Sequence, residues 1–377
     1  MEYVEKDIEA FGGLRLDVNS ANVPLGSFTV LQNIHPIAPD RLQKIYGAVP
    51  KRAPVVDTIA PTGDAPQCFA PLFSITLSGV PKLCTPLQTT SSVIRLFDHT
   101  DNSEITGGST FVASAPILFA SYNNKNFIVN DNSIFPQEIT SSTAKGDTGF
   151  PKSKYLLALK DRLYFANIES GGASQFRRTT PATETLDTST YNTFETPGVL
   201  TGLAYNAYST DVQGLLSELL LLKDRAIMRF RPGESSADDQ KDILSAKWSV
   251  LRGTSAVVNS SVGTIIVAAS GTQRKLFLVR PNTQLLETPM SFPLGVALDD
   301  TATSTLPKAE IILAMLGNFL VALRYEGVDG PGPTQLYFTD LDQFREDQLP
   351  VWSGPHSFGD DPIVGTELPN ASFVTVT

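Results

Sequence analysis

The chain has 377 residues, of which 41% are hydrophobic and 18% charged, with a net charge of −10 and a pI near 4.9. That apolar fraction is enough to bury a large core. The acidic balance excludes a protein that wraps nucleic acid, because such binding needs clustered Lys and Arg to replace counterions.

Residues 1–66 hold short apolar stretches separated by Pro and Gly, and these predict single short strands. Such a segment would lie across a rigid body or donate strands that complete the last structural unit. Residues 1–10 are acidic and have no apolar core, so no secretory signal is predicted. The longest apolar stretches of the chain are interrupted by polar residues, so no membrane span is predicted either. We expect a soluble protein made in a reducing compartment.

From residue 67 onward, an apolar run, a polar break and a second apolar run recur seven times. The repeats lie at 72–83, 117–129, 156–165, 219–228, 265–279, 311–323 and 363–376. Apolar runs without strict alternation around a tight break are typical of β-hairpins buried on both faces. Repetition at roughly 40–50 residues is typical of propeller blades. The sequence therefore predicts an all-β fold, a β-propeller of seven blades over residues 67–377, with 1–66 as an extended arm that helps close the ring.

Two details bear on this repeat. The break reads Lys-Asp-Arg in both the third and the fourth repeat, and a further similar stretch follows the third and sixth hairpins, at 172–179 and 332–339. The stretch 180–213, rich in Thr, Ser, Asn and Tyr, is predicted to be an inserted loop. Stretches 215–230 and 309–324 could be helices, but they lack a 3.6-residue period, so strands are favoured.

Residues that would carry catalysis, a cofactor or a metal are not found. His35, His99 and His356 each stand alone among loop-like neighbours, and zinc spacing, a phosphate loop and a nucleophile elbow are missing. The acidic pairs Asp238-Asp239 and Asp340/Asp342 are expected to be solvated. The stretch 209–214 departs from the Ser-x-Asp-x-Gly box of sialidase-like propellers. We predict no catalytic, cofactor or metal site.

The two cysteines, Cys68 and Cys84, both fall in the first repeat. A disulfide between neighbouring strands and two buried reduced thiols are both open, and the reducing compartment favours the thiols.

The N-terminal layout resembles the tail accessory or stabilisation proteins of short-tailed bacteriophages, a family of virion propellers. Four elements carry the likeness: Gly12-Gly13-Leu14, Pro24-Leu25-Gly26, Leu31-Gln32-Asn33-Ile34 and 41–47. A fifth is 335–341 with the downstream Trp352, which looks like the family's outer strand; Tyr46-Gly47 departs from its commoner Arg-Pro-Gly turn.

The resemblance implies a structural protein that is not an enzyme. It implies a ring of six copies in the virion neck or tail, which meets the adaptor or portal and guides or retains the genome. DNA would pass without specific binding, as the negative charge suggests. Residues 1–66 and 180–213 are the candidates for inter-subunit contact, with solvated loops as the alternative. Two other functions stay open: a glycan-binding or glycan-active propeller, and an interaction scaffold outside any virus.

Overall fold

A computed structural model shows an all-β protein. The structure describes residues 13–14, 27–28, 34–38, 41–44, 67–68, 73–88, 94–98, 100–101, 103–107, 111–112, 117–140, 143–146, 149–169, 171–210, 214–233, 236–250, 257–281, 290–299, 309–326, 334–342, 344 and 349–356. Within these ranges the helical elements are two single 3-10 turns, Ser236–Asp238 and Phe292–Leu294, and no helix is long and apolar enough to cross a membrane. The chain forms two compact units, one of residues 1–51 with 255–376 and the other of 52–254 with 377.

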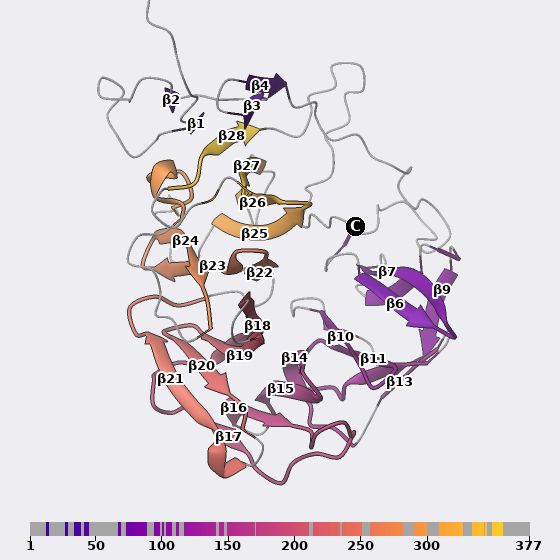
Figure 1. The fold of residues 1–377 in the computed structure, drawn as a ribbon. Coiled ribbons are helices and arrows are strands. Elements are labelled where there is room, and N and C mark those ends of the chain that lie inside the picture. The colour runs from indigo at the N-terminus through magenta and orange to yellow at the C-terminus, as the bar shows by residue number, and fades with distance from the viewer. Residues whose placement is uncertain are drawn as a thin grey trace, which may run out of the picture. The chain divides into compact units, whose positions relative to one another are not determined.

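The unit of residues 52–254 begins with a nine-stranded sheet (Figure 1). Its strands are β5 (Gln67–Cys68), β6 (Phe73–Leu77), β7 (Val80–Gln88), β8 (Ile94–Asp98), β9 (Ser103–Gly107), β10 (Leu118–Tyr122), β11 (Lys125–Val129), β12 (Gln137–Ile139) and β13 (Thr143–Gly146). The strands β6–β9 and β10–β13 form two antiparallel groups in chain order. A short parallel pairing of β9 with β13 joins the groups, and β5 pairs with the far end of β7.

Two four-stranded antiparallel sheets complete this unit. One consists of β14 (Ser153–Leu159), β15 (Arg162–Ile168), β16 (Gly172–Arg178) and β17 (Tyr191–Asn192), and the other of β18 (Leu200–Thr210), β19 (Gly214–Lys223), β20 (Ile227–Arg231) and β21 (Gln240–Ser245). We call them the β14 sheet and the β18 sheet. Strands β10 and β11 pack on β14, and β14, β15 and β16 pack on β18. Neighbouring sheets in the chain therefore lie face to face.

Strand β15 shows why its apolar run does not alternate with polar residues. All seven of its residues are buried. Leu163 and Phe165 enter the core shared with β10 and β11, whereas Tyr164 and Ala166 enter the core shared with β18–β20. Successive side chains of a strand point to opposite faces, so a strand between two sheets needs apolar residues at every position. The prediction of a strand buried on both faces is confirmed for β15, whereas its hairpin partner β14 is buried at only three of seven positions.

The unit of residues 1–51 with 255–376 holds one three-stranded and one four-stranded antiparallel sheet. They consist of β22 (Val257–Ser260), β23 (Gly263–Ser270) and β24 (Gln273–Val279), and of β25 (Ala309–Leu316), β26 (Phe319–Glu326), β27 (Thr334–Asp340) and β28 (Trp352–His356). Two short pairs come from the N-terminal residues: β1 (Gly13–Leu14) with β2 (Ser27–Phe28), and β3 (Ile34–Ala38) with β4 (Arg41–Lys44). β1 and β3 both lie against β28.

Six of the seven predicted hairpins are confirmed. They are β6–β7, β10–β11, β14–β15, β19–β20, β23–β24 and β25–β26. At the β10–β11 turn, Asn123 and Asn124 both have positive φ, the backbone of a two-residue hairpin turn for which Asn is well suited. The strand assignments for 215–230 and 309–324 are also confirmed. The seventh repeat, 363–376, lies outside the described residues, so the blade count and ring closure by residues 1–66 stay predictions.

The inserted loop predicted at 180–213 is wrong for residues 191–192 and 200–210, which form β17 and β18. Tyr, Thr and Leu, common in this segment, are good strand formers, and Leu200 and Leu203 are buried. The fourth and fifth repeats are consequently the second hairpins of their sheets, with β18 and β22 as additional first strands. First strands begin at residues 73, 118, 153, 200, 257 and 309, so the apparent excess between the third and fourth repeats disappears.

Candidate functional site

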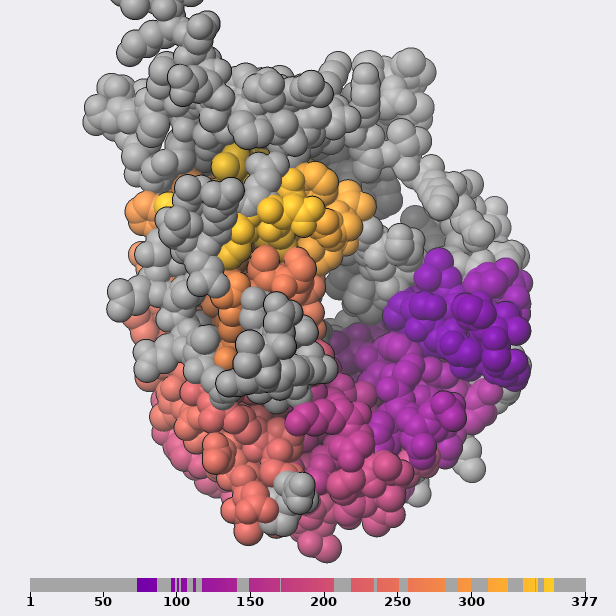
Figure 2. Space-filling view, viewed as in Figure 1, coloured from indigo at the N-terminus to yellow at the C-terminus, as the bar shows by residue number. Residues whose placement is uncertain are grey.

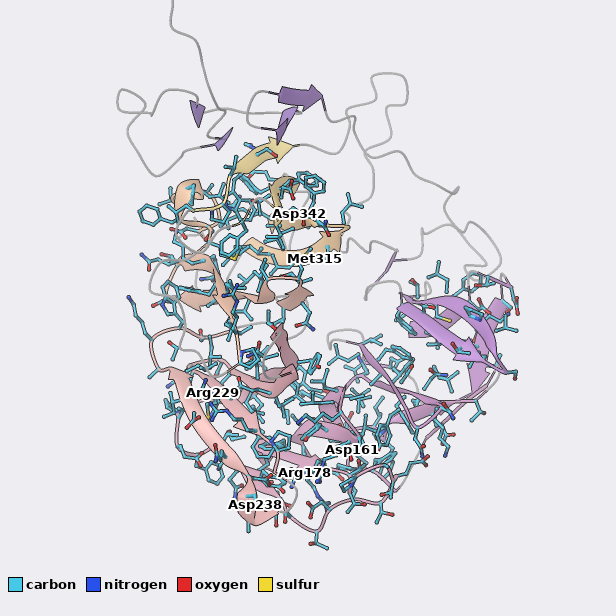
Figure 3. All side chains as sticks on the ribbon, viewed as in Figure 1. Asp161, Arg178, Arg229, Asp238, Met315 and Asp342 are labelled. Atoms are coloured by element: carbon cyan, nitrogen blue, oxygen red, sulfur yellow. The ribbon has the colours of Figure 1, made fainter. Side chains whose placement is uncertain are left out.

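A buried arginine joins the β14 sheet to the turn before β21. Arg178 on β16 donates a hydrogen bond from Nη1 to Asp239 Oδ1 at 3.0 Å, and its Nη2 lies 2.9 Å from Oδ2 as part of the same ion pair. The side chains are only 1% and 6% exposed, and Figure 3 shows Arg178 near Asp238, the neighbour of this carboxylate. The expectation that Asp238-Asp239 is solvated is wrong for Asp239. A buried pair of this kind costs desolvation, which the attraction between the two charges and their remaining hydrogen bonds must offset.

Aromatic rings enclose the Arg178 guanidinium. Its central carbon lies 5.0 Å from the centre of the Tyr191 ring and 5.7 Å from that of Phe230, within the range of cation–π attraction. Burial raises the pKa of Tyr164 to about 12. The pKa of Tyr191 is raised more strongly, mainly by burial and to a smaller extent by the neighbouring Asp239. Both hydroxyls therefore stay protonated near neutral pH. The contact between Arg178 and Asp239 joins the β14 sheet to the turn before β21, and we call it the Arg178 clamp.

A second clamp is Lys223, the last residue of β19. It is fully buried, and its ammonium donates to the backbone carbonyls of Thr193 and Thr196, at 2.6 Å and 2.7 Å. Burial lowers the pKa of this lysine, although Asp224 and Glu195 act in the opposite direction. A buried ammonium bound to neutral carbonyls is costly. The two carbonyls that this ammonium binds belong to residues 192–199, which we call the 192–199 loop.

Other side chains fasten the same loop. The Ser174 hydroxyl donates to the Gly198 carbonyl at 2.9 Å, and the Ser174 carbonyl accepts from the Thr193 amide at 3.0 Å. Asp224 Oδ1 accepts the Val199 amide at 2.9 Å. Gly198 has a φ of +89°, and a Cβ added to it would lie only 1.9 Å from this Asp224 oxygen. On the other side, Lys241 donates to the Asn192 carbonyl at 2.8 Å.

The 192–199 loop carries an exposed aromatic side chain. Phe194 is 69% exposed, the most exposed aromatic among the described residues. Beside it, Glu195 pairs with Lys241 of β21. The hydrogen bonds described above hold the backbone that carries this phenyl ring.

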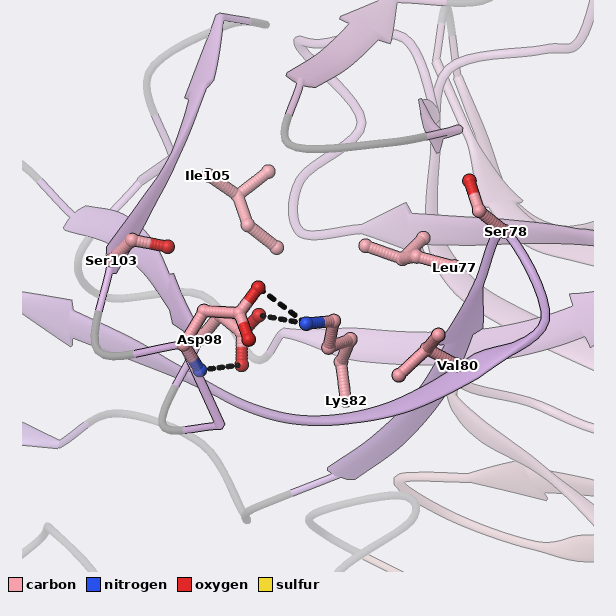
Figure 4. A pocket seen from close by; sticks show the side chains of 8 residues that line it. Leu77, Ser78, Val80, Lys82, Asp98, Ser103 and Ile105 are labelled. Carbon is pink, nitrogen blue, oxygen red and sulfur yellow. Dashed lines mark hydrogen bonds and ion pairs between the residues drawn. The ribbon is translucent and has the colours of Figure 1, made fainter.

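A shallow hollow opens on the first sheet of the same unit (Figure 4). Its volume is about 280 Å³, and Leu77, Val80 and Ile105 form its apolar walls. Lys82 crosses its floor, paired with Asp101 and lying 3.7 Å from Asp98. The surface of this sheet is the purple region of Figure 2. Leu77 and Ile105 are buried, whereas Val80 is 49% exposed at the rim.

The histidines were expected to lie in loops, and two of them do not. His35 falls in β3 and His356 ends β28, so neither is in a loop, and His99 lies outside the described residues. Asp342 accepts the Asn318 amide at 2.6 Å near the surface. Over the described ranges, His, Cys, Asp and Glu form no group of three or more that could hold a metal ion.

Cys84 is a free, buried thiol on β7. Burial raises the pKa of this thiol to about 12, with the negative charge of Asp98 adding to the effect. Cys84 is therefore a neutral, packed side chain at physiological pH, as expected for a structural cysteine.

Sequence reasoning missed the Arg178 clamp, the Lys223 clamp and the hollow. The repeated Lys-Asp-Arg tripeptide was the available signal for Lys223, but the two copies are not equivalent. In the third repeat, Lys160 and Asp161 form the two-residue turn and Arg162 begins β15. In the fourth, Lys223 still belongs to β19, and its amide bonds to the Ala226 carbonyl at 3.0 Å across a longer turn.

No protein-family profile matches the chain, and no curated protein matches it either. Several solved structures are similar over most of the chain. The extracellular domain of the putative one-component system BT4673 from B. thetaiotaomicron is 13% identical, with a TM-score of 0.46, over 74% of this chain and 33% of that one. BamB from Moraxella catarrhalis is 10% identical, with a TM-score of 0.42, over 82% and 97%. The SapL1 lectin in complex with alpha methyl fucoside is 12% identical, with a TM-score of 0.37, over 72% and 93%. Because all three TM-scores lie below 0.5, these likenesses carry no conclusion about this chain.

Proposed function

We propose that this chain is a seven-bladed β-propeller that serves as a structural protein of a phage neck or tail, in a ring of identical copies. The six described hairpin groups supply six blades, and the repeat at 363–376 supplies the seventh together with residues from 1–66. The copies would meet the adaptor or portal and would guide or retain the genome. The net charge of −10 suits DNA that passes without being gripped.

One observation supports the proposal: three elements of the distant resemblance lie in, or directly against, the β25–β28 sheet. Leu336–Asp340 of the family-like strand lies in β27, and Trp352 begins β28 directly opposite Thr339. Trp352 is fully buried, and its indole nitrogen donates to the Met290 carbonyl at 2.9 Å. Gly13-Leu14 of the N-terminal motif, in β1, lies against the same strand β28. Motifs that are far apart in the sequence are thus neighbours around β28, which supports treating them as parts of one structural pattern.

Electron microscopy of the purified full chain, and of phage particles that contain it, tests this proposal. We expect rings with a central opening and a matching density in the neck or tail of the particle. A chain that stays monomeric at high concentration and is missing from every particle refutes it.

The alternative, a glycan-binding or glycan-active propeller, has one observation in its favour. The hollow on the first sheet carries Asp98, Asp101 and Ser103, which could accept or donate bonds to sugar hydroxyls. Its lining residues include no aromatic ring on which a sugar could stack, so the structural role is favoured. Binding of the full chain to a glycan array, lost in Asp98→Asn, would support the alternative.

A further inference from the structure

The amide side chain of Asn167 joins three neighbouring sheets of the unit of residues 52–254. Asn167 lies near the end of β15 and is only 6% exposed. Its Nδ2 donates to the Leu200 carbonyl, at the start of β18, at 2.9 Å. Its Oδ1 accepts from Nδ2 of Asn132 at 3.2 Å, and Asn132 lies between β11 and β12 of the nine-stranded sheet. One side chain therefore bonds to both of the sheets that pack on its own.

The backbone at Asn167 is unusual for a strand. Its φ is +56°, and the register between β15 and β16 shifts between Ala166 and Ile168. A positive φ is uncommon for a residue other than Gly, although Asn adopts it more readily than most residues do. An irregularity of this kind changes the direction in which a strand presents a side chain. The strand thus departs from regular pairing at the residue whose amide bonds to the neighbouring sheets.

The two bonds also fix the orientation of the Asn167 amide. The Leu200 carbonyl can only accept a hydrogen bond, so Nδ2 of Asn167 faces it and Oδ1 is left to accept from another donor. Asn132 supplies that donor. Next to Asn132, Asp131 pairs with Lys154 of β14 at 3.6 Å and adds a second contact between the same two sheets.

We propose that Asn167 is a conformational lock, which makes the nine-stranded sheet, the β14 sheet and the β18 sheet open as one cooperative unit. Parts of a protein commonly open separately, because they differ in local stability. Here neither neighbouring sheet can separate from the β14 sheet without breaking a hydrogen bond of the buried Asn167 amide. The lock goes beyond the proposed function and does not depend on it.

Native-state hydrogen exchange of the full chain tests the lock. Exchange is followed by mass spectrometry at increasing urea concentrations below the unfolding transition. In the wild-type chain the slowest amides of β11, β15 and β18 should open together, with one common dependence on urea. Asn167→Ala removes both bonds, so β11 and β18 should each exchange about 10-fold faster than in the wild-type chain and no longer follow β15.

Two further variants separate the contributions. Asn132→Ala alters a partly exposed residue, so it should fold, and it removes only the bond to the nine-stranded sheet. It should separate β11 from β15 while β18 still opens with β15. Asn167→Gly removes both bonds but tolerates the positive φ, so it should separate the same strands as Asn167→Ala does.

Asn124→Ala is the matched control. Asn124 also has a positive φ, of +60°, but it is exposed in the turn between β10 and β11. Its replacement should affect the exchange of that hairpin turn alone and should leave β11, β15 and β18 opening together.

Three outcomes overturn the inference. If the three strands still open together in both Asn167 variants, the amide bonds do not lock the sheets. Separation in Asn167→Ala but not in Asn167→Gly assigns the effect to the backbone at this position instead. A wild-type chain in which β11, β15 and β18 already open separately has no lock to remove.

Discussion

Replacing Asp239 by Asn removes the charge that Arg178 meets in the interior while keeping the size of the side chain. The Asn amide oxygen can still accept the Gly233 amide, which now bonds to Asp239 Oδ1 at 2.8 Å. The change is thus confined to the ion pair and leaves Arg178 buried.

The expected cost is about 3 kcal/mol in free energy of unfolding. Breaking a buried ion pair by removing one partner typically costs 3–5 kcal/mol, because an uncompensated charge stays inside. Asp187, at 3.4 Å from the Arg178 Nε, still provides part of the compensation and places the value at the low end of that range. A loss of this size is large against a total stability of about 5–15 kcal/mol.

The double variant Arg178→Met/Asp239→Asn separates charge burial from packing. Met removes the stranded charge, so the double variant should be about 1–2 kcal/mol more stable than Asp239→Asn alone. Urea titration followed by the fluorescence of Trp248, which lies in the same unit, measures each free energy. Asp242→Asn is the matched control, since Asp242 is 45% exposed and its pair with Arg229 should contribute less than about 1 kcal/mol. If Asp239→Asn costs no more than this control, or the double variant is no better than the single one, the clamp reasoning is wrong.

Three further predictions concern the loop and the thiol. Lys223→Met should speed amide hydrogen exchange throughout residues 193–199, because the bonds from the ammonium to this loop are lost. In the wild-type chain the pKa of Lys223 is lowered by folding, so the unfolded chain binds the extra proton and the free energy of unfolding should rise with pH between the folded pKa and about 10.5. This rise should be flattened in Lys223→Met, and a wild-type curve without the rise argues against the lowered pKa. Gly198→Ala should lower the free energy of unfolding by about 1–3 kcal/mol, with only partial recovery in Gly198→Ala/Asp224→Ala, because the positive φ remains strained after the clash is gone; full recovery would show that the backbone is not strained. Cys84 should resist alkylation by iodoacetamide at pH 8 in the folded chain and react in urea, and equal rates in mass spectrometry would contradict its burial.

The hairpins could be predicted from sequence because apolar runs and turn residues encode them locally. The run 219–222 and the Asn123-Asn124 pair are short signals that need no knowledge of the rest of the chain. Strand β18 was missed because its Thr, Ser, Asn and Tyr residues were interpreted by polarity. In the folded strand Thr201 and Asn206 are buried beside Leu200 and Leu203, because they donate hydrogen bonds to the Val250 carbonyl and to Glu218.

The clamps could not be predicted because their partners are distant in sequence. Arg178 and Asp239 are 61 residues apart, and Lys223 bonds to carbonyls 27 and 30 residues away. Backbone carbonyls carry no sequence signal at all. The hollow depends on the arrangement of Leu77, Val80 and Ile105 after folding, which hydrophobic patterning alone does not specify.

The two clamps, Arg178–Asp239 and Lys223, add directional contacts between neighbouring sheets that apolar packing alone does not provide. Apolar contact fixes the spacing of neighbouring sheets, but it is non-directional and only weakly resists sliding of one sheet over another. The Arg178–Asp239 ion pair ties the β14 sheet to the turn before β21, and Lys223 ties β19 to the 192–199 loop, which follows β17. Directional bonds of this kind fix the lateral position of one sheet on the next. Because the 192–199 loop lies at this junction and is bonded to both sheets, any sliding of one sheet over the other would break the bonds that hold this loop.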